Sequence, residues 1–216
     1  MQVVYEDNHI IIVSKVSGEI VQGDKTGDEP LSETVKKYLK MKYNKPGNVF
    51  LGVVHRLDRP VSGLVTFAKT SKALSRLNDM FRNGDVHKTY WALTRNYPPA
   101  EEGTLTHWLR RNEQQNKSYA YDKEVPGSKK AMLKYRVIGH GDNYTLLEVN
   151  LLTGRHHQIR CQLAKMLRTI PGHRHTHALG HRHRDHHCVG DAARAGTTFP
   201  LRCGQTLDVR VVHRQV

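Results

Sequence analysis

The segment HRLDRPVSGL contains a carboxylate whose surroundings suit catalysis. Asp58 lies between Arg56 and Arg59 in a loop that joins two apolar stretches. A carboxylate beside guanidinium groups stays ionised, which suits a nucleophile or a general base better than a proton donor. Pro60 and Gly63 stiffen and turn the loop, as the positioning of a reactive group requires. A surface loop with an ordinary ion pair would contain the same residues, so this segment alone leaves both interpretations open.

Two further segments carry side chains that fit nucleic-acid chemistry. In TGRHHQIR, Arg155 and Arg160 bracket two histidines where a turn enters a helix. Cations and backbone N–H groups at such a place can hold phosphate. Tyr90 lies in KTYW on an expected strand, where its ring could stack against a base. Each feature also has a structural explanation, as an exposed basic helix start and as a core tyrosine.

The composition favours a polyanionic partner. The net charge is +14, and each phosphate that a basic protein neutralises releases condensed counterions. No apolar run approaches the roughly 20 residues that span a membrane, and the acidic start MQVVYEDNHIII predicts a strand instead of a signal peptide. No G-x-G-x-x-G or G-K-[ST] occurs, so no nucleotide cofactor is expected. The odd cysteine count (Cys161, Cys188 and Cys203) shows no disulfide framework and favours the cytoplasm.

Two compositions meet after Leu167. Residues 1–167 hold all sixteen lysines, all nine tyrosines and every Ser, Asn and Glu, whereas residues 168–216 hold none of these but eight Arg and eight His. We therefore predict a folded domain over residues 1–167 and an atypical tail over residues 168–216. The tail could be a metal-binding extension, a basic RNA-binding arm or the product of a shifted reading frame. We favour the shifted frame, because folded domains draw on the missing residue types and no paired C-x-x-C supports a zinc site.

Periodicity predicts the elements that position these side chains. Two short strands are expected around an Asp7-Asn8 turn within residues 2–22, and further strands at 49–54, 63–68, 88–95, 133–138 and 144–152. Helices are expected over residues 31–43, from a Ser71 cap to a stop at Gly84, and along HHQIRCQLAKML. Strands adjoin one another with few helices between them. The predicted fold is therefore α+β, with a mixed, mainly antiparallel central sheet and flanking helices.

Together the three segments resemble one family. HRLDRPVSGL, KTYWAL and TGRHHQIRCQLA, in this order, are similar to the signature segments of RluA-like pseudouridine synthases, which modify ribosomal or transfer RNA. The resemblance extends from about residue 2 to residue 166. It implies that Asp58 is the catalytic aspartate and that Arg160 pairs with it. It also implies that Tyr90 stacks on the target base and serves in proton removal late in the reaction.

The resemblance also implies how the chain meets RNA. Arg56 would help to occupy the space that a flipped nucleotide leaves, and Arg155 would position the RNA or a loop; Arg59 and His156 complete the expected RNA-binding residues. The family implies a cleft across the sheet and needs no metal and no organic cofactor. We expect a monomer that acts on structured RNA. The alternative from another class is a non-catalytic basic RNA-binding protein.

The resemblance ends where the composition changes. Members of the family continue with a glycine-rich G-D-x-x-Y-G stretch and a later L-H-A strand, which close the sheet and the pocket. Residues 168–216 contain neither. The resemblance thus implies that part of the site wall is missing, and we expect weak or no activity from this chain.

Overall fold

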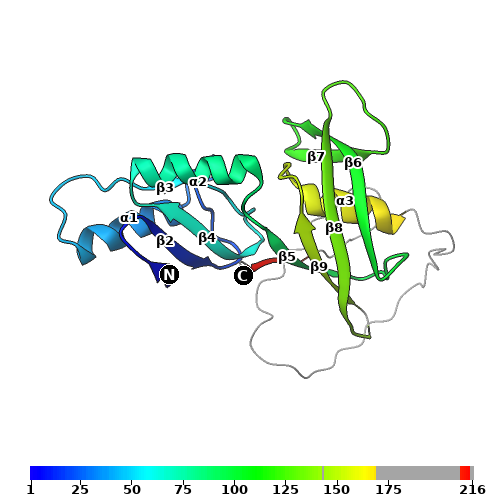
Figure 1. Ribbon diagram of the computed structural model, residues 1–216, viewed down its shortest axis with the longest axis horizontal. Helices are drawn as coiled ribbons and strands as arrows, with labels where there is room; N and C mark the ends of the chain where they lie inside the picture. Colours follow the sequence, from blue (N-terminus) through cyan, green and yellow to red (C-terminus); the bar gives the residue numbers. More distant parts are fainter. Residues whose placement is uncertain (143, 169–209, 215–216) are drawn as a thin grey trace.

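The computed structural model describes residues 1–142, 144–168 and 210–214, and its strands form one sheet with two halves (Figure 1). The elements of the N-terminal half are β1 (Gln2–Glu6), β2 (Ile10–Lys15), α1 (Leu31–Lys42), β3 (Gly52–Val53), β4 (Ser62–Ala68) and α2 (Ser71–Asn83). Strand β2 lies between β1 and β4, and the short β3 pairs with one end of β4. Both helices and the two strands predicted near the start are therefore present.

The turn between β1 and β2 forms because Asp7 satisfies the backbone that follows it. Its Oδ1 accepts hydrogen bonds from the N–H groups of His9 and Ile10, both at 2.7 Å. Such bonds from an aspartate to the next residues stabilise a tight turn. The register then places Ile11 and Val13 at zero exposure on the core face of β2.

Helix α2 shows a corrected start and a confirmed stop. The cap is Thr70 and not the predicted Ser71, because the hydroxyl of Thr70 accepts from the Ala73 N–H at 3.1 Å and its backbone is extended. Ser71 is the first helical residue. At the other end Gly84 has a φ of 84°, a left-handed conformation that favours glycine and ends the helix.

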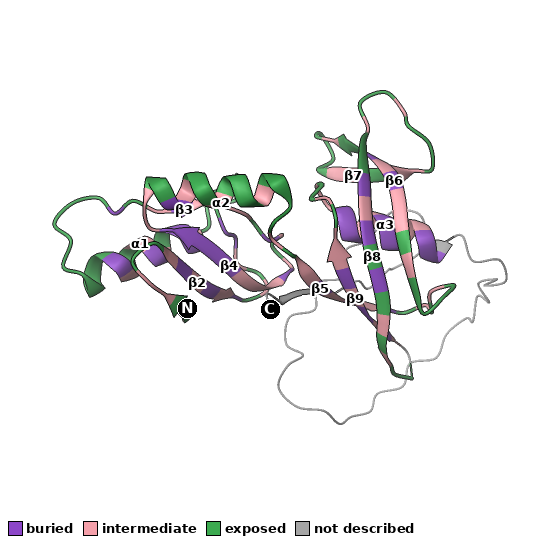
Figure 2. Ribbon diagram, viewed as in Figure 1, coloured by how far each residue is buried: buried purple, intermediate pink, exposed green. Residues whose placement is uncertain are grey.

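The C-terminal half surrounds the third helix. Its elements are β5 (Thr89–Thr94), β6 (Glu102–Asn112), β7 (Lys117–Tyr121), β8 (Lys129–His140), β9 (Thr145–Leu151) and α3 (Gln158–Arg168). Helix α3 buries Ile159, Leu163 and Met166 against this part of the sheet (Figure 2). The predicted antiparallel pair is confirmed as β8 and β9, whereas β6 and β7 were not predicted.

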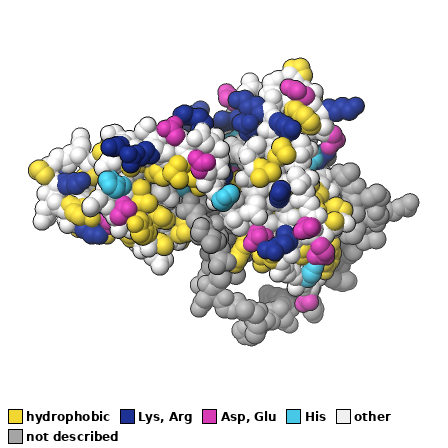
Figure 3. All heavy atoms as spheres, viewed as in Figure 1, with side chains coloured by type: hydrophobic (Ala, Val, Ile, Leu, Met, Phe, Trp, Pro, Cys, Tyr) yellow, Lys and Arg dark blue, Asp and Glu magenta, His cyan; other side chains and the backbone are white. Residues whose placement is uncertain are grey.

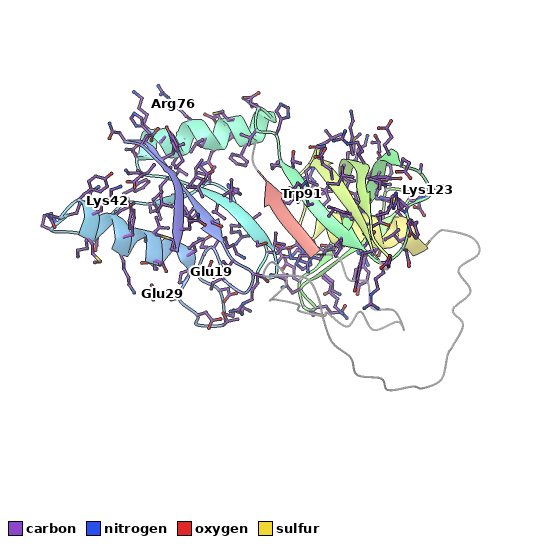
Figure 4. All side chains as sticks on the ribbon, turned by 90° about the horizontal axis from the view of Figure 1, so that it is seen from below. Glu19, Glu29, Lys42, Arg76, Trp91 and Lys123 are labelled. Carbon is purple, nitrogen blue, oxygen red and sulfur yellow. The ribbon has the colours of Figure 1, made fainter. Side chains whose placement is uncertain are left out.

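The strand β10 (Arg210–Arg214) joins the two halves. It pairs in parallel with β4 at Ser62 and Gly63 and antiparallel with residues 89–93 of β5. The strand order is β1-β2-β4-β10-β5-β9-β8-β6-β7, so among the described strands only β10 contacts both halves. In Figure 4, Trp91 of β5 lies at this junction. All the other pairs are antiparallel, which confirms the predicted mixed, mainly antiparallel sheet.

The structure describes only residues 168 and 210–214 of the tail predicted over residues 168–216. Residues 210–214 belong to the sheet, although the sequence offered no reason to place a strand of this domain there. Residues 169–209, which contain the His-rich run, lie outside the described residues. The shifted reading frame and the boundary at residue 167 therefore stay predictions, which the nucleotide sequence after codon 167 would test.

A buried carboxylate ties β1 to α1 and β4. Glu6, whose side chain is 7% exposed, accepts from Lys42 at 2.8 Å, from Lys69 at 2.7 Å and from the Tyr43 hydroxyl at 2.7 Å. Burial alone would raise the pKa of Glu6, but these three donors overcome that effect and lower the pKa from 4.5 to about 2. Lys42 lies on α1, far from the junction of the halves (Figure 4).

The Glu6→Gln variant should lose stability in a pH-dependent way. Because the folded-state pKa lies below that of the unfolded chain, the contribution of Glu6 is complete above about pH 5 and disappears as the pH falls toward 2. We expect a loss of about 2 kcal/mol at pH 7 and little difference near pH 2, measured by urea unfolding. The exposed pair of Glu33 and Lys36 provides the control, since Glu33→Gln should cost less than about 0.5 kcal/mol.

Candidate active site

A buried lysine holds the backbone of the loop that carries Asp58. Lys15, at the end of β2, is 1% exposed, and its ammonium donates to the carbonyls of Asp58 (3.2 Å), Arg59 (3.1 Å) and Val61 (2.6 Å). Burial lowers the pKa of Lys15 to about 8, although the charges of Glu19 and Asp58 oppose this shift. Sequence reasoning missed Lys15, which fixes the backbone on both sides of the carboxylate.

The loop is also fixed by its neighbours in the chain. Leu57 and Val61 are 6% and 7% exposed and anchor it in the core on either side of Asp58. The Val61 N–H donates to the Asp58 carbonyl at 2.9 Å, and Gly63 has a φ of 141°, which favours glycine. The side chain of Asp58, 40% exposed, thus projects from a rigid support.

Helix α3 brings the cation that pairs with Asp58. The Arg160 guanidinium donates to Asp58 Oδ2 across the interface between the two halves of the molecule. Sequence reasoning placed Arg56 and Arg59 beside this carboxylate because they flank it in the chain. In the structure Arg59 turns away to pair with Asp28 and also donates to the Gly18 carbonyl at 3.0 Å. The charged partner of Asp58 is therefore distant in sequence.

Tyr90 lies close enough to Asp58 for the charge of this carboxylate to affect its pKa. Its side chain belongs to the buried face of β5, packs in the hydrophobic core and is 9% exposed. Burial and, to a smaller extent, the negative charge of Asp58 raise the pKa of Tyr90 to about 12. Tyr90 is thus a neutral phenol near neutral pH, next to an anion. The structure brings together Asp58, Tyr90 and Arg160, the three residues expected to act in catalysis.

Two stacked histidines complete the surroundings of Asp58. The rings of His156 and His157 lie 3.6 Å apart, and His156 Nδ1 is 2.9 Å from the Ser118 hydroxyl. His157 Nε2 lies 3.9 Å from Asp58 Oδ2. Burial and the charge of Arg160 lower the pKa of His157 to about 4, while the charge of Asp58 opposes this shift. Sequence reasoning had named His156 for RNA binding but had missed His157 and Ser118.

The turn before α3 is organised by a buried glutamine. Gln158 is 3% exposed, its Oε1 accepts from the Arg155 N–H at 2.9 Å, and its Nε2 donates to the Met132 carbonyl at 3.0 Å. This arrangement fixes the start of the helix that bears Arg160. The exposed Arg155 donates from Nε to the Lys130 carbonyl at 3.1 Å, and Arg56 is exposed as well.

The described residues add two observations on other classes of function. Within residues 1–142, 144–168 and 210–214, no group of three or more His, Cys, Asp or Glu side chains could hold a metal ion. The same part of the chain contains no helix that is long and apolar enough to cross a membrane. Cys161 is a free thiol, and Cys188, Cys203 and the His-rich run fall outside the description.

Comparisons with known proteins identify the family of this chain. The model of the RNA pseudouridylate synthase family matches residues 9–165. The ribosomal large subunit pseudouridine synthase C of Vibrio cholerae is 32% identical over 158 residues, which are 73% of this chain and 47% of that protein. The tRNA pseudouridine synthase C of the same organism is 28% identical over 80% of this chain and 72% of its own length. The chain spans about half the length of several of the curated relatives that it matches.

A solved structure supports the same fold. Human RNA Pseudouridylate Synthase Domain Containing 4 superimposes with a TM-score of 0.66 at 21% identity, over 77% of this chain and 65% of that chain. At this identity the likeness shows the fold alone. With the family match over residues 9–165, it confirms the resemblance that the three segments carry. This chain belongs to the RNA pseudouridylate synthase family and is of the RluA-like type.

Proposed function

We propose that this chain isomerises uridine to pseudouridine in ribosomal or transfer RNA, with Asp58 as the catalytic residue. The observation that carries the proposal is the ion pair between Asp58 and Arg160, with the buried Tyr90 close enough for the charge of Asp58 to raise its pKa. The names of its relatives support RNA as the substrate, since they include ribosomal and tRNA enzymes. We expect the reaction to take place in the cytoplasm, in a monomer without metal or organic cofactor.

The chemistry of the isomerisation explains the site. The N1–C1′ bond of uridine breaks, the base turns and C5 bonds to C1′, after which C5 loses its proton and N1 gains one. Asp58 either attacks C1′ or removes a 2′ proton, and in both cases its charge is consumed and later restored. Arg160 keeps the reactive anion available once the bound RNA excludes water from the site. The geometry is compatible with both routes.

Access to the sugar requires the base to leave the RNA stack. This step costs a few kcal/mol and needs groups that fill the vacancy and hold the backbone. Arg56 is exposed one residue away from the anchoring Leu57 and is suited to fill the vacancy. Arg155 and His156, at the start of α3, are suited to hold phosphate. Figure 3 shows Lys and Arg side chains along the upper edge of the molecule, over both halves.

Arg59 would bind RNA only after giving up its ion pair with Asp28. Its ion pair with Asp28 and its bond to Gly18 direct it toward the loop before α1. An exposed ion pair contributes little stability, so an RNA phosphate can replace Asp28 as its partner. Binding of RNA at all these cations should weaken as salt rises.

The Tyr90→Phe variant should bind RNA normally and form product about a hundredfold more slowly. A phenol with a pKa near 12 cannot accept the C5 proton directly. It can pass the proton on only by giving its own to Asp58, and Phe removes this relay. Single-turnover formation of pseudouridine measures the effect. Tyr97→Phe, at an exposed site, should leave the rate unchanged, and equal rates for both variants would contradict the role of Tyr90.

The proposed activity is tested by incubating the full chain with ribosomal RNA fragments and tRNA transcripts. Pseudouridine is detected by chemical labelling and mass spectrometry. We expect product at a defined uridine, formed slowly by this chain and faster by a version in which residues 168–216 are replaced by those of a relative, and none from Asp58→Asn in either background. RNA binding that depends on salt, with no product from the chain or from a version in which residues 168–216 are replaced by those of a relative, would establish the non-catalytic binding protein instead.

A further inference from the structure

We propose that His157 is a positioning residue for Asp58, which together with Arg160 holds one carboxylate oxygen and leaves the other for the ribose. This inference rests on the proposed function and assigns a role that neither the sequence motifs nor the comparisons supply. It follows from the way two side chains near the start of α3 approach one oxygen atom of Asp58.

The two partners of Asp58 face the same oxygen. Arg160 donates to Oδ2, and His157 Nε2 lies 3.9 Å from that oxygen. Within the described residues no hydrogen bond or ion pair engages Oδ1 of Asp58. A distance of 3.9 Å is beyond a hydrogen bond, but contacts in catalytic sites commonly shorten when the substrate excludes water. Two donors on Oδ2 would stop the carboxylate from rotating and keep Oδ1 directed at the sugar.

The backbone and the ring of His157 are both constrained. Its φ of 54° is one that residues other than glycine seldom adopt, and such conformations cluster at functional sites. The ring stacks on His156 at 3.6 Å, and His156 is held by the Ser118 hydroxyl of β7 at 2.9 Å. The imidazole is therefore anchored to the sheet, so its position does not depend on Asp58.

The charges around His157 favour its neutral form. It is faced by Asp58 from the β3–β4 loop, by Arg160 from α3, by Arg111 from β6 and by the neighbouring His156. Burial is the largest cause of its lowered pKa, and Arg160 adds to the effect. A neutral imidazole with its proton on Nε2 can orient a carboxylate without neutralising it. A second full cation at this place would instead weaken Asp58 as a base or nucleophile.

A matched pair of variants separates this role from simple packing. His157→Gln keeps an N–H donor near the place of Nε2, and His157→Leu keeps the bulk without a donor. Gln and Leu are similarly unfavourable at the positive φ of position 157, so the two variants should lose similar stability from backbone strain. We expect the Gln variant to keep kcat within about threefold. The Leu variant should lose kcat by about tenfold to a hundredfold with KM for RNA nearly unchanged. Equal kcat in the two variants would overturn the proposal.

A titration of the imidazole by NMR provides a second measurement that needs no turnover. In the wild-type chain we expect the pKa of His157 near 4. It should fall further in Asp58→Asn, which removes a charge that raises it, and it should rise in Arg160→Gln. A His157 pKa that is the same in Asp58→Asn as in the wild type would refute the coupling. If neither the wild-type chain nor the version with residues 168–216 replaced by those of a relative forms product, the proposed function fails, and the titration alone decides whether His157 and Asp58 interact.

Discussion

The Asp58→Asn variant is expected to bind RNA as tightly as the wild-type chain and to form pseudouridine at least about a thousandfold more slowly. An amide cannot attack C1′ or take a 2′ proton, whichever route the reaction follows. The substitution leaves every Lys and Arg in place, so the attraction to phosphate persists. Loss of one negative charge could only strengthen binding.

Two measurements check this result. Filter binding at several salt concentrations gives the affinity, and single-turnover product analysis gives the rate. Asp28→Asn is the matched control, because Asp28 is also a loop carboxylate paired with an arginine, but its partner is Arg59 and not Arg160. It should keep its rate within about threefold. A rate for Asp58→Asn close to that of Asp28→Asn would remove Asp58 from the mechanism.

The Lys15→Met variant should lose both stability and activity. Four carbonyls, those of Val16, Asp58, Arg59 and Val61, accept from this one ammonium. A methionine fills the space but leaves these acceptors without a donor, which we expect to cost about 2–4 kcal/mol. The loop would then hold Asp58 less precisely, and a displacement of about 1 Å can reduce a rate about a hundredfold.

The size of both effects is measurable in one preparation. Urea unfolding gives the loss of stability, and kcat is measured at a temperature where the variant remains folded. Lys37→Met removes a lysine from an exposed pair with Glu29 and should change neither quantity appreciably. A folded Lys15→Met protein with wild-type kcat would show that the carbonyl contacts do not position Asp58.

Local signals in the sequence predicted much of the fold. The Asp7 turn and the Gly84 stop depend on a few neighbouring residues, so their chemistry is visible in the chain. The predicted cap of α2, Ser71, was one residue too late. Thr70 and Ser71 can both cap a helix, and only the backbone conformation decides between them. Strand β6 was missed since its inward positions include the buried His107, which interrupts the alternation of apolar and polar residues.

The candidate site was predicted less completely than the turns, because its contacts join residues that are far apart in the sequence. Asp58, Tyr90 and Arg160 were proposed by resemblance, and no spacing rule would have paired Asp58 with an arginine in a distant helix. Lys15 was taken as part of a strand, because a fully buried lysine contradicts the usual preference for solvent. His157 differs from His156 only in its backbone conformation and its direction, which the sequence does not express.

The position of β10 has a consequence for the order in which the molecule assembles. Each half of the sheet can form from hairpins between strands that follow one another closely in the chain. By contrast, β10 must insert between β4 and β5, which lie more than a hundred residues earlier in the sequence. Bringing such distant segments together requires the closure of a long loop, which is slow. The contact between Asp58 and Arg160 spans the same two halves. A folding intermediate with both halves formed and the catalytic pair still apart is therefore expected, and such a species would bind RNA before it could modify it.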